Sequence, residues 1–574
     1  MIAAVVHPRG AAAASVVLER MASAATWREI RTRGGAIVAS DVACSSSDGL
    51  ALREATSLDA ASREAHTGAF VALDADFEGS VLLSCGSFGG RSLFHAHSVD
   101  GAFVACSQMV PLLAAVERSR LSADADRLAS LCVCTAEPRV ESTAFSGVAR
   151  VAPCTTLRAG ASHIEAKVRP RVELGPLDGD PVEIAEELWR RFEGSVRFAI
   201  GDARTVAVMV GGGVDSSALL AAAVAVARGA SPKEVHALAL DFDAVGTDRP
   251  YLAALADALG IAPVRIAPGE AAPFFAGSHL LDAQPYWLSI GPMEQLVFHR
   301  ARELGASTLL TGYLADEILA GDLRGFAAEA SHSPLAAVRA AVELRLPWET
   351  TARERVMNYV LRPLVKPLLP RALIARLSRS SQDVASSWAG TRMRKATERA
   401  LAHSSARLPP RTPTERFERF ARDDAYAEFA DLRSQLEATT GVVRKDPFAN
   451  ESVLELLARV RPTLQSHGDM HRGLFRLAAS GRLPERVRTR LDKSYFEPAF
   501  AEVATSAGGF DVLGDLWLPR ALERLDILDA VAFRRAMAPL FAMPASTSQS
   551  GVLWTYASIV LSCERFARMC EATS

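Results

Sequence analysis

The stretch that decides the fold runs from Val206 to Ser217 and reads VAVMVGGGVDSS. Its opening residues are apolar and uncharged, which predicts a central strand that is buried on both faces. The alanine- and leucine-rich run over 218–227 predicts the helix that follows. The three glycines between them let the backbone turn sharply, and the first N–H groups of the new helix favour phosphate. The stretch therefore predicts an anion-binding loop between a strand and a helix.

The type of loop follows from the residues around it. A Walker-type loop ends in Lys and then Ser or Thr, but the next lysine here is Lys233, beyond the predicted helix. A dinucleotide-binding fingerprint has a third glycine where this chain has Ser216. What remains is a G-G-x-D-S loop in which Asp215 is placed to hold a metal that bridges phosphate oxygens. A glycine turn without a ligand is the simpler alternative, and it leaves the Asp-Ser pair unexplained.

Composition excludes several classes of protein. With 574 residues, 49% of them apolar and 23% charged, the chain is expected to form two or three ordinary globular domains. A net charge of -2 gives no reason to expect binding to nucleic acid or to a membrane. No apolar run is long enough to span a bilayer, and no signal peptide is visible. The eight cysteines contain no C-x-x-C pair, so neither zinc nor a disulfide framework is indicated and a cytoplasmic location is expected.

The first domain is expected over residues 1–175 and reads as short β-rich segments broken by Gly and Ser. This pattern predicts an α+β fold in which one sheet packs on another. The expected strands are 69–73, 80–84 and 102–106, with helices near 15–24 and 107–116. Spaced prolines then indicate a linker; they are Pro153, Pro170, Pro176 and Pro181.

The second domain is expected over residues 181–574 and starts with an amphipathic helix at 182–198. Strands at 235–240, 261–266 and 307–311 alternate with helices, which predicts an α/β doubly wound parallel sheet with ligands at the carboxyl ends of its strands. The glycine loop and Asp316 both fall at that edge. After Val453 the chain is expected to form an all-α C-terminal part that packs against this sheet; its helices are 453–460, 471–479, 514–526, 530–540 and 553–569.

Two of these segments carry a family resemblance. Gly211–Ser216 resembles the S-G-G-x-D-S pyrophosphate loop of the asparagine synthetase superfamily, with Gly211 in place of Ser. Thr311–Gly321 resembles the superfamily's S-G-x-G-A-D-E-x-x-x-G, with Leu314 in place of Gly. Weaker motifs follow in the family's order, and residues 1–175 resemble a class II glutaminase domain. These motifs are Asp241–Tyr251 with Asp248 in the middle, Pro447–Asn450 for P-F-L-D, and Leu483–Phe496 with Arg490 and Lys493 before the aromatic residue.

The resemblance implies a ligase that uses ATP and Mg²⁺ to activate a carboxylate as an acyl-adenylate, which a nitrogen nucleophile then attacks. Magnesium would lie on Asp215 and Asp316, and Lys493 would stabilise the oxyanion, with Asp316 and Glu317 also in the catalytic set. Alternatives stay open, because Lys493 can be a solvated surface lysine and Asp316 with Glu317 a helix N-terminal acid pair. The implied ATP-binding residues are Val210, Gly211, Gly212, Gly213, Val214, Asp215, Ser216, Leu240, Thr311 and Gly312, with the adenine near Leu238–Leu240.

Two departures from the family narrow the reaction. A class II glutaminase uses a Cys exposed after removal of Met1, but the second residue here is Ile2, so we expect the amine to come with the substrate. In the family's G-x-E-x-R-x-P-F-x-D, a Glu lies two residues after the Gly, and in β-lactam synthetases this acid supports a tyrosine that deprotonates a poor nucleophile. Here that position is Val443. The nucleophile should therefore be an ordinary amine that needs little activation.

An adenylating ligase without glutaminase and without that acid resembles the lasso peptide cyclases, which close a macrolactam between a peptide's N-terminal amine and an Asp or Glu side chain. The resemblance implies a precursor peptide substrate, a leader-binding protein and a leader protease as partners, in antibiotic biosynthesis. A helical insertion at about 325–438, interrupted by Pro363–Pro370, is consistent with a large substrate. A solvated helical insertion is an equally good interpretation.

Two other functions remain open. A β-lactam-like or other small-molecule amide synthetase would need an acid and a tyrosine elsewhere, such as Tyr426 with Glu428. An inactive scaffold that binds a peptide or a partner enzyme is the other, favoured by the changes at Gly211 and Leu314. Histidines add little: His467 and His471 have the spacing of a metal pair without a third ligand, and His95 and His97 are expected to be structural.

Overall fold

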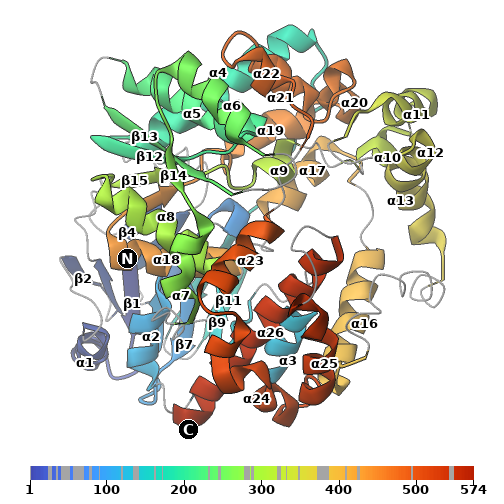
Figure 1. The fold of residues 1–574 in the computed structure, drawn as a ribbon. Coiled ribbons are helices and arrows are strands. Elements are labelled where there is room, and N and C mark those ends of the chain that lie inside the picture. Colours follow the sequence, from blue (N-terminus) through green and yellow to red (C-terminus); the bar gives the residue numbers. More distant parts are fainter. Residues whose placement is uncertain are drawn as a thin grey trace.

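The chain forms two antiparallel sheets followed by one parallel sheet, with helices around them (Figure 1). The computed structural model describes residues 2–22, 29–33, 36–40, 52–55, 70–75, 80–89, 91–117, 121–133, 141–160, 163–170, 172–229, 233–242, 247–276, 285, 290–319, 323, 325–330, 332–346, 350–370, 387–406, 410–422, 427–492, 496–541 and 548–573.

The N-terminal sheets pack face to face, as the sequence predicted. The first has the order β2 (Glu29–Arg33), β3 (Ala36–Ser40), β1 (Ile2–Val6), β8 (Phe103–Cys106), β7 (Phe94–His97), β9 (Val148–Arg150). The second has the order β11 (Ile164–Val168), β10 (Thr155–Ala159), β6 (Val81–Cys85), β5 (Phe70–Ala75), β4 (Leu52–Ala55). Ile2, Ala4 and Val6 lie in the core between the sheets, whereas Ala3 and Val5 face the core with α1 (Ala11–Ala22) and α2 (Met109–Val116). This alternation follows from the period of two along a strand.

The third sheet is parallel throughout and has the predicted doubly wound form. Its order is β14 (Val264–Ile266), β13 (Glu234–Leu240), β12 (Thr205–Met209), β15 (Thr308–Leu310), β16 (Val443–Lys445). Val206 and Val208 lie in the core with α4 (Pro181–Ile200), α5 (Val214–Ala227) and α6 (Arg249–Leu259). Ala207 lies in the other core, with α8 (Gly291–Glu303). Helices therefore cover both faces of β12, and its apolar residues are buried on both sides.

Local signals set the ends of these helices. Asp180 caps α4 by accepting the N–H of Val182 at 2.7 Å, with Pro181 in the first turn. At the end of α6, Gly260 takes a left-handed backbone with φ of 70°. Both ends agree with what the residue types favour.

The strand β16 was not predicted from the sequence. Its three residues are Val443, Arg444 and Lys445, and two of them are charged. Arg444 is nevertheless buried, and its guanidinium forms an ion pair with Asp446 at 3.0 Å. A buried cation is tolerated in a strand only with such a partner, and residue type alone did not reveal it.

The helices of segment 325–438 lie in four places. A lobe, seen at the right of Figure 1, contains α10 (Gly325–Ala330), α11 (Pro334–Glu343), α12 (Ala352–Val356), η5 (Met357–Leu361), α13 (Arg362–Val365) and η6 (Lys366–Leu368). α16 (Thr391–Ala406) packs on α3 (Ala125–Cys132), α17 (Pro413–Ala421) on α19 (Glu451–Arg459), and α18 (Ala427–Thr440) on α8. The predicted interruption at Pro363–Pro370 comes at the end of this stretch: Pro363 is tolerated in the first turn of α13, whereas η6 ends at Leu368 and Leu369 is extended before Pro370.

The prediction that the C-terminal helices pack as one lobe on the parallel sheet is wrong in part. α19, α21 (Gly473–Ala478) and α22 (Glu485–Arg488) do pack near α4, α5 and α6. However, α26 (Ser548–Thr573) packs on α3 of the N-terminal domain, with Phe145 and Phe566 rings 4.7 Å apart. α24 (Arg520–Arg524) and α25 (Ala530–Met537) accompany it, with α23 (Glu497–Ser506) between the two groups (Figure 1). None of the described helices is long and apolar enough to cross a membrane.

Candidate functional site

A cavity of about 350 Å³ lies at the carboxyl ends of the parallel strands. Most of the predicted ATP-binding residues line it: Val210, Gly211, Gly213, Val214, Asp215, Ser216, Leu240, Thr311 and Gly312. The predicted metal residues Asp215 and Asp316 both line it as well. This edge of a parallel sheet is where the topology places ligand sites, so segments that are distant in sequence meet here.

The glycine loop is held by its own serines. Ser216 Oγ accepts the N–H of Gly211 at 3.0 Å and also lies 3.3 Å from the Gly211 carbonyl oxygen. Ser217 Oγ donates to the same carbonyl at 3.3 Å. Helix α5 then begins at Val214, so Asp215 stands in its first turn. Hydrogen bonds within the segment therefore hold the loop, and the residues of the first turn of α5 line the cavity, where the N–H groups of a helix start favour an anion.

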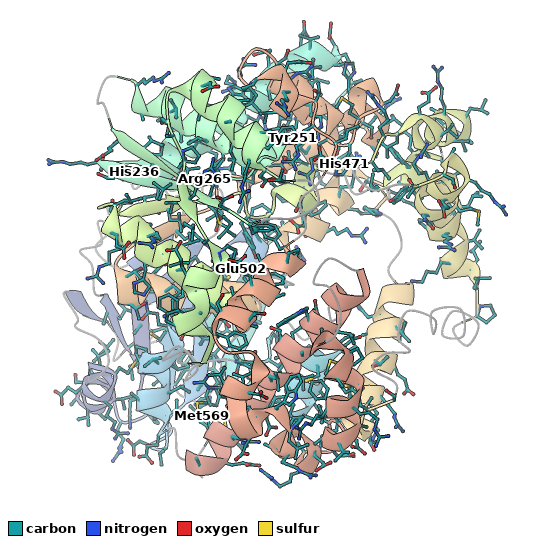
Figure 2. All side chains as sticks on the ribbon, in the orientation of Figure 1. His236, Tyr251, Arg265, His471, Glu502 and Met569 are labelled. Carbon is teal, nitrogen blue, oxygen red and sulfur yellow. The ribbon has the colours of Figure 1, made fainter. Side chains whose placement is uncertain are left out.

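A group of charged residues that also line the cavity packs against the loop. Arg490 forms ion pairs with Asp248 at 2.6 Å and Asp492 at 3.2 Å, and its guanidinium lies 4.0 Å from the ring centre of Tyr251. A Cβ at Gly212 would collide with Arg490 Nη1 and come within 3.0 Å of Asp248. A side chain at position 212 would therefore have to displace the Arg490–Asp248 ion pair; Gly212 itself is not among the lining residues. Tyr251 is labelled in Figure 2, on α6.

The carboxylate of Asp248 also explains why this chain has Gly211 at the first position of the loop, where the family motif has serine. A Cβ at Gly211 would lie 3.0 Å from Asp248 Oδ2, which is tighter than ordinary contact. Glycine at this position therefore lets Asp248 approach the loop. Leu314, the other departure, keeps the left-handed backbone with φ of 65° that a glycine adopts without strain. Its side chain is buried, which offsets part of that strain.

Asp215 and Asp316 meet at one cation, Arg472, which the sequence did not single out. Arg472 Nη1 pairs with Asp215 and Nη2 pairs with Asp316. Arg472 immediately precedes α21 with a φ of 59°, so a left-handed residue directs its side chain into the cavity. The only sequence signal was its place beside His471 and Gly473, which has no specific meaning.

The two carboxylates fit a magnesium ion. Asp215 Oδ1 is buried and has no hydrogen-bond partner in the described part of the chain, although a buried carboxylate oxygen normally has one. Carboxylate oxygens are the ligands that Mg²⁺ prefers, and it commonly uses one or two of them together with substrate phosphates. Within the described residues no group of three or more His, Cys, Asp or Glu could hold a metal alone. The site therefore suits a metal that arrives with phosphate.

Tyr313 also lines the cavity and was missed, although it lies inside the quoted Thr311–Gly321 motif. The guanidinium groups of Arg433 and Arg444 lie 4.7 Å and 5.2 Å from the centre of its ring. Burial raises the pKa of Tyr313 well above its usual value, while both arginines oppose the rise. The phenol is therefore neutral at physiological pH and can donate a hydrogen bond.

Paired charges fix this end of the cavity. Arg433 donates to Glu294 through two nitrogens, at 2.7 Å and 3.1 Å. Burial alone would raise the pKa of Glu294, but the charge and hydrogen bonds of Arg433, together with the charge of Arg444, outweigh it and lower the pKa. Thr311 Oγ1 donates to Asp446 at 2.6 Å, and Asp446 pairs with Arg444. The polar wall is thus rigid and linked to β16.

Five residues named from the sequence are not placed at the cavity. Glu317 follows Asp316 in the first turn of α9 (Ala315–Leu319) and does not line it. Lys493 lies outside the described residues, and so does Tyr426; the side chain of Glu428 is likewise not described. Val443 is 36% exposed and is not among the lining residues.

Comparison with models of known protein families identifies the family of this chain. The model of the family described as asparagine synthase matches residues 187–566, which is more than half of the 574 residues. The match contains the glycine loop, the five parallel strands, Asp316 and the Arg472 and Arg490 segments. A search among curated proteins found no match. From the family match and the site that it encloses, we conclude that this chain belongs to the asparagine synthase family.

Proposed function

We propose that this protein is an ATP-dependent, AMP-forming ligase that adenylates a carboxylate, releases pyrophosphate and forms an amide bond. The family match supports an ATP-dependent carbon–nitrogen ligase in general. The observation that carries the adenylating step is the meeting of Asp215 and Asp316 on one cation beside a closed glycine loop. These parts are what a triphosphate and its metal require.

Each residue has a role in this proposal. The N–H groups at the start of α5 bind phosphate, and Asp215 and Asp316 hold Mg²⁺. When bound there, the metal neutralises charge on the departing pyrophosphate. Leu240 and Phe242 supply an apolar wall near the end of β13 for the adenine. Lys493 remains the proposed group that stabilises the oxyanion.

We infer that the amine comes with the substrate. At the start of β1 the chain has Ile2, whose side chain is fully buried and whose N–H is donated to Ser107 Oγ at 3.0 Å. An apolar side chain inside the sandwich cannot replace a nucleophilic thiol. Adding glutamine should therefore not substitute for the substrate's own amine. Release of glutamate during turnover would contradict this.

The finer proposal is a peptide macrolactam synthetase of the lasso type. Its substrate would be a precursor peptide whose Asp or Glu side chain is activated and whose N-terminal amine attacks. The chain has Val443 where β-lactam synthetases have an acid, and this supports an amine that needs little activation. A leader-binding protein and a leader protease are the proposed partners.

A second candidate is a small-molecule amide synthetase, and Tyr313 favours it. A tyrosine in the cavity beside Asp316 is the kind of residue that such an enzyme needs. Tyr313→Phe separates the two, since it keeps the ring between the arginines and removes only the hydroxyl. Loss of adenylate transfer with unchanged adenylation would favour the small-molecule reaction, and retention of both would favour the peptide reaction.

Exchange of labelled pyrophosphate into ATP tests the proposal. The full chain is incubated with candidate carboxylates or precursor peptides, and exchange should depend on the substrate and be lost in Asp215→Asn. Mass spectrometry of the product should show the loss of one water without addition of ammonia. A chain that binds the peptide but exchanges no pyrophosphate with any of these substrates would be a scaffold, and the proposal would fail.

A further inference from the structure

A single guanidinium occupies the place between the two carboxylates that we assign to the metal. Arg472 uses one terminal nitrogen for Asp215 and the other for Asp316. Because a guanidinium is planar and its nitrogens are fixed relative to one another, this bridge sets the relative positions of both carboxylates. A metal ion needs oxygens of the same two groups, so the two cations compete.

The backbone holds Arg472 in this place. A left-handed conformation in a residue other than glycine costs about 1–2 kcal/mol, so the surrounding chain has to impose it. Gly473 donates its N–H to Met470 at 2.9 Å, and a Cβ at Gly473 would collide with the carbonyl oxygen of His467. Arg345, from the lobe, donates to the carbonyl of Asp469 at 2.7 Å and accepts from His471 at 3.1 Å. The turn is therefore fixed on two sides.

The bridge is partly buried, and burial strengthens the attraction between its charges. The side chains of Arg472 and Asp215 are 12% and 14% exposed, whereas that of Asp316 is 56% exposed. Water screens this pair of charges weakly, so Asp215 strongly prefers to have a cation beside it. An arginine guanidinium remains protonated in proteins at neutral pH. The free protein therefore already contains a cation for these carboxylates.

We propose that Arg472 is a positioning residue that closes the metal site until nucleotide phosphate is present. In the free protein it holds Asp215 and Asp316 together. When phosphate is present, the guanidinium pairs with phosphate oxygens instead and leaves both carboxylates to the metal. The inference rests on the proposed function for the assignment of these aspartates to a metal. It goes further by predicting that metal alone binds poorly and that the nucleotide is needed to admit it.

The experiment measures metal binding without nucleotide, substrate or turnover. Mn²⁺ is titrated into the full chain, and free Mn²⁺ is followed by electron paramagnetic resonance. Arg472→Gln should bind one Mn²⁺ per chain at least about tenfold more tightly than the wild type, which corresponds to removing about 1.4 kcal/mol of competition. Arg472→Lys should give a smaller gain, because an ammonium cannot bridge two carboxylates in the same plane.

Two further variants locate the effect. Arg482→Gln removes an arginine that pairs with Glu186 outside the cavity, and it should leave Mn²⁺ affinity at the wild-type value. Adding Asp215→Asn to Arg472→Gln should abolish the gain. Equal affinity in wild type, Arg472→Gln and Arg472→Lys would overturn the inference, and so would a gain that survives Asp215→Asn. If Arg472→Gln does not fold, as judged by circular dichroism, the result with Arg472→Lys decides.

Failure of the inference and failure of the proposed function give different results. Pyrophosphate exchange without any gain of Mn²⁺ binding would remove the role of Arg472 and leave the ligase intact. A gain of Mn²⁺ binding in a protein that exchanges no pyrophosphate would support the role of Arg472 and refute the proposed ligase activity.

Discussion

Arg490 and Asp248 form an ion pair at 2.6 Å that lies against the glycine loop, between α6 and the segment after α22. The guanidinium is buried, with 2% of its side chain exposed, and it also stacks on Tyr251. The shape of the loop thus depends on an ion pair whose two residues also line the cavity. The position of this ion pair explains why the middle residue of the loop, Gly212, is a glycine.

Replacing that glycine should disturb the protein more than replacing its neighbour. Gly212→Ala places a methyl group against Arg490 and should cost about 1–3 kcal/mol of unfolding free energy, as overpacking of a tight site does. Gly213→Ala is the matched control, because nothing lies within 4 Å of its Cβ and its φ is −78°. Chemical denaturation of both variants provides the measurement. Equal stabilities would show that Arg490 moves aside without cost.

If Asp215 and Asp316 hold the metal, replacing either one should reduce pyrophosphate exchange while the protein stays folded. Asp215→Asn and Asp316→Asn each remove a charge that the metal requires, and pyrophosphate exchange should fall on the order of 10²–10³-fold. Circular dichroism should be unchanged, since both side chains lie at a cavity edge. Glu193→Gln, on the exposed side of α4, serves as a control for the loss of one carboxylate. Wild-type exchange rates in either aspartate variant would refute the assignment.

The N-terminal domain is attached through buried charges, which predicts a large stability effect. Asp431 of α18 pairs with Arg150 of β9 at 2.5 Å, with 1% and 3% of these side chains exposed. Removing one partner leaves an uncompensated buried charge, so Asp431→Ala should destabilise the protein by about 3–5 kcal/mol. Disrupting the exposed pair Glu193–Arg197 should cost at most about 1 kcal/mol. Urea denaturation compares the two, and similar midpoints would contradict the argument.

The pH dependence of stability should contain a contribution from His95. Burial, followed by repulsion from His97, lowers the pKa of His95 from 6.5 to about 4. Between these values the unfolded chain binds a proton that the folded protein does not, so folding becomes less favourable as pH falls from 6.5 to 4. His95→Phe keeps a ring beside Phe103, which lies 5.6 Å away, and should flatten this part of the profile. An unchanged slope in that variant would assign the effect to other groups.

The sequence by itself determined the sheet edge and most of the loop. Local sequence favours a strand for an uncharged apolar run, a turn for glycines and a helix for an Ala/Leu run, whatever the rest of the fold. The residues from Val206 to Ala227 therefore predicted β12, the loop and α5. The positions of Asp215 and Asp316 followed as well, because the carboxyl ends of parallel strands meet at one edge. Short β-rich segments broken by Gly and Ser likewise indicated the N-terminal sandwich.

The tertiary structure alone decided which charges pair. Arg472 and Arg490 come from late in the chain, and an arginine that bridges two acids looks the same in sequence as one in water. The strand β16 and the attachment of α26 to α3 were hidden for the same reason: Arg444 can be buried, and the apolar face of α26 covered, only when distant partners arrive. Local preference acts over a few residues, whereas burial and ion pairing depend on where the folded chain brings distant segments together.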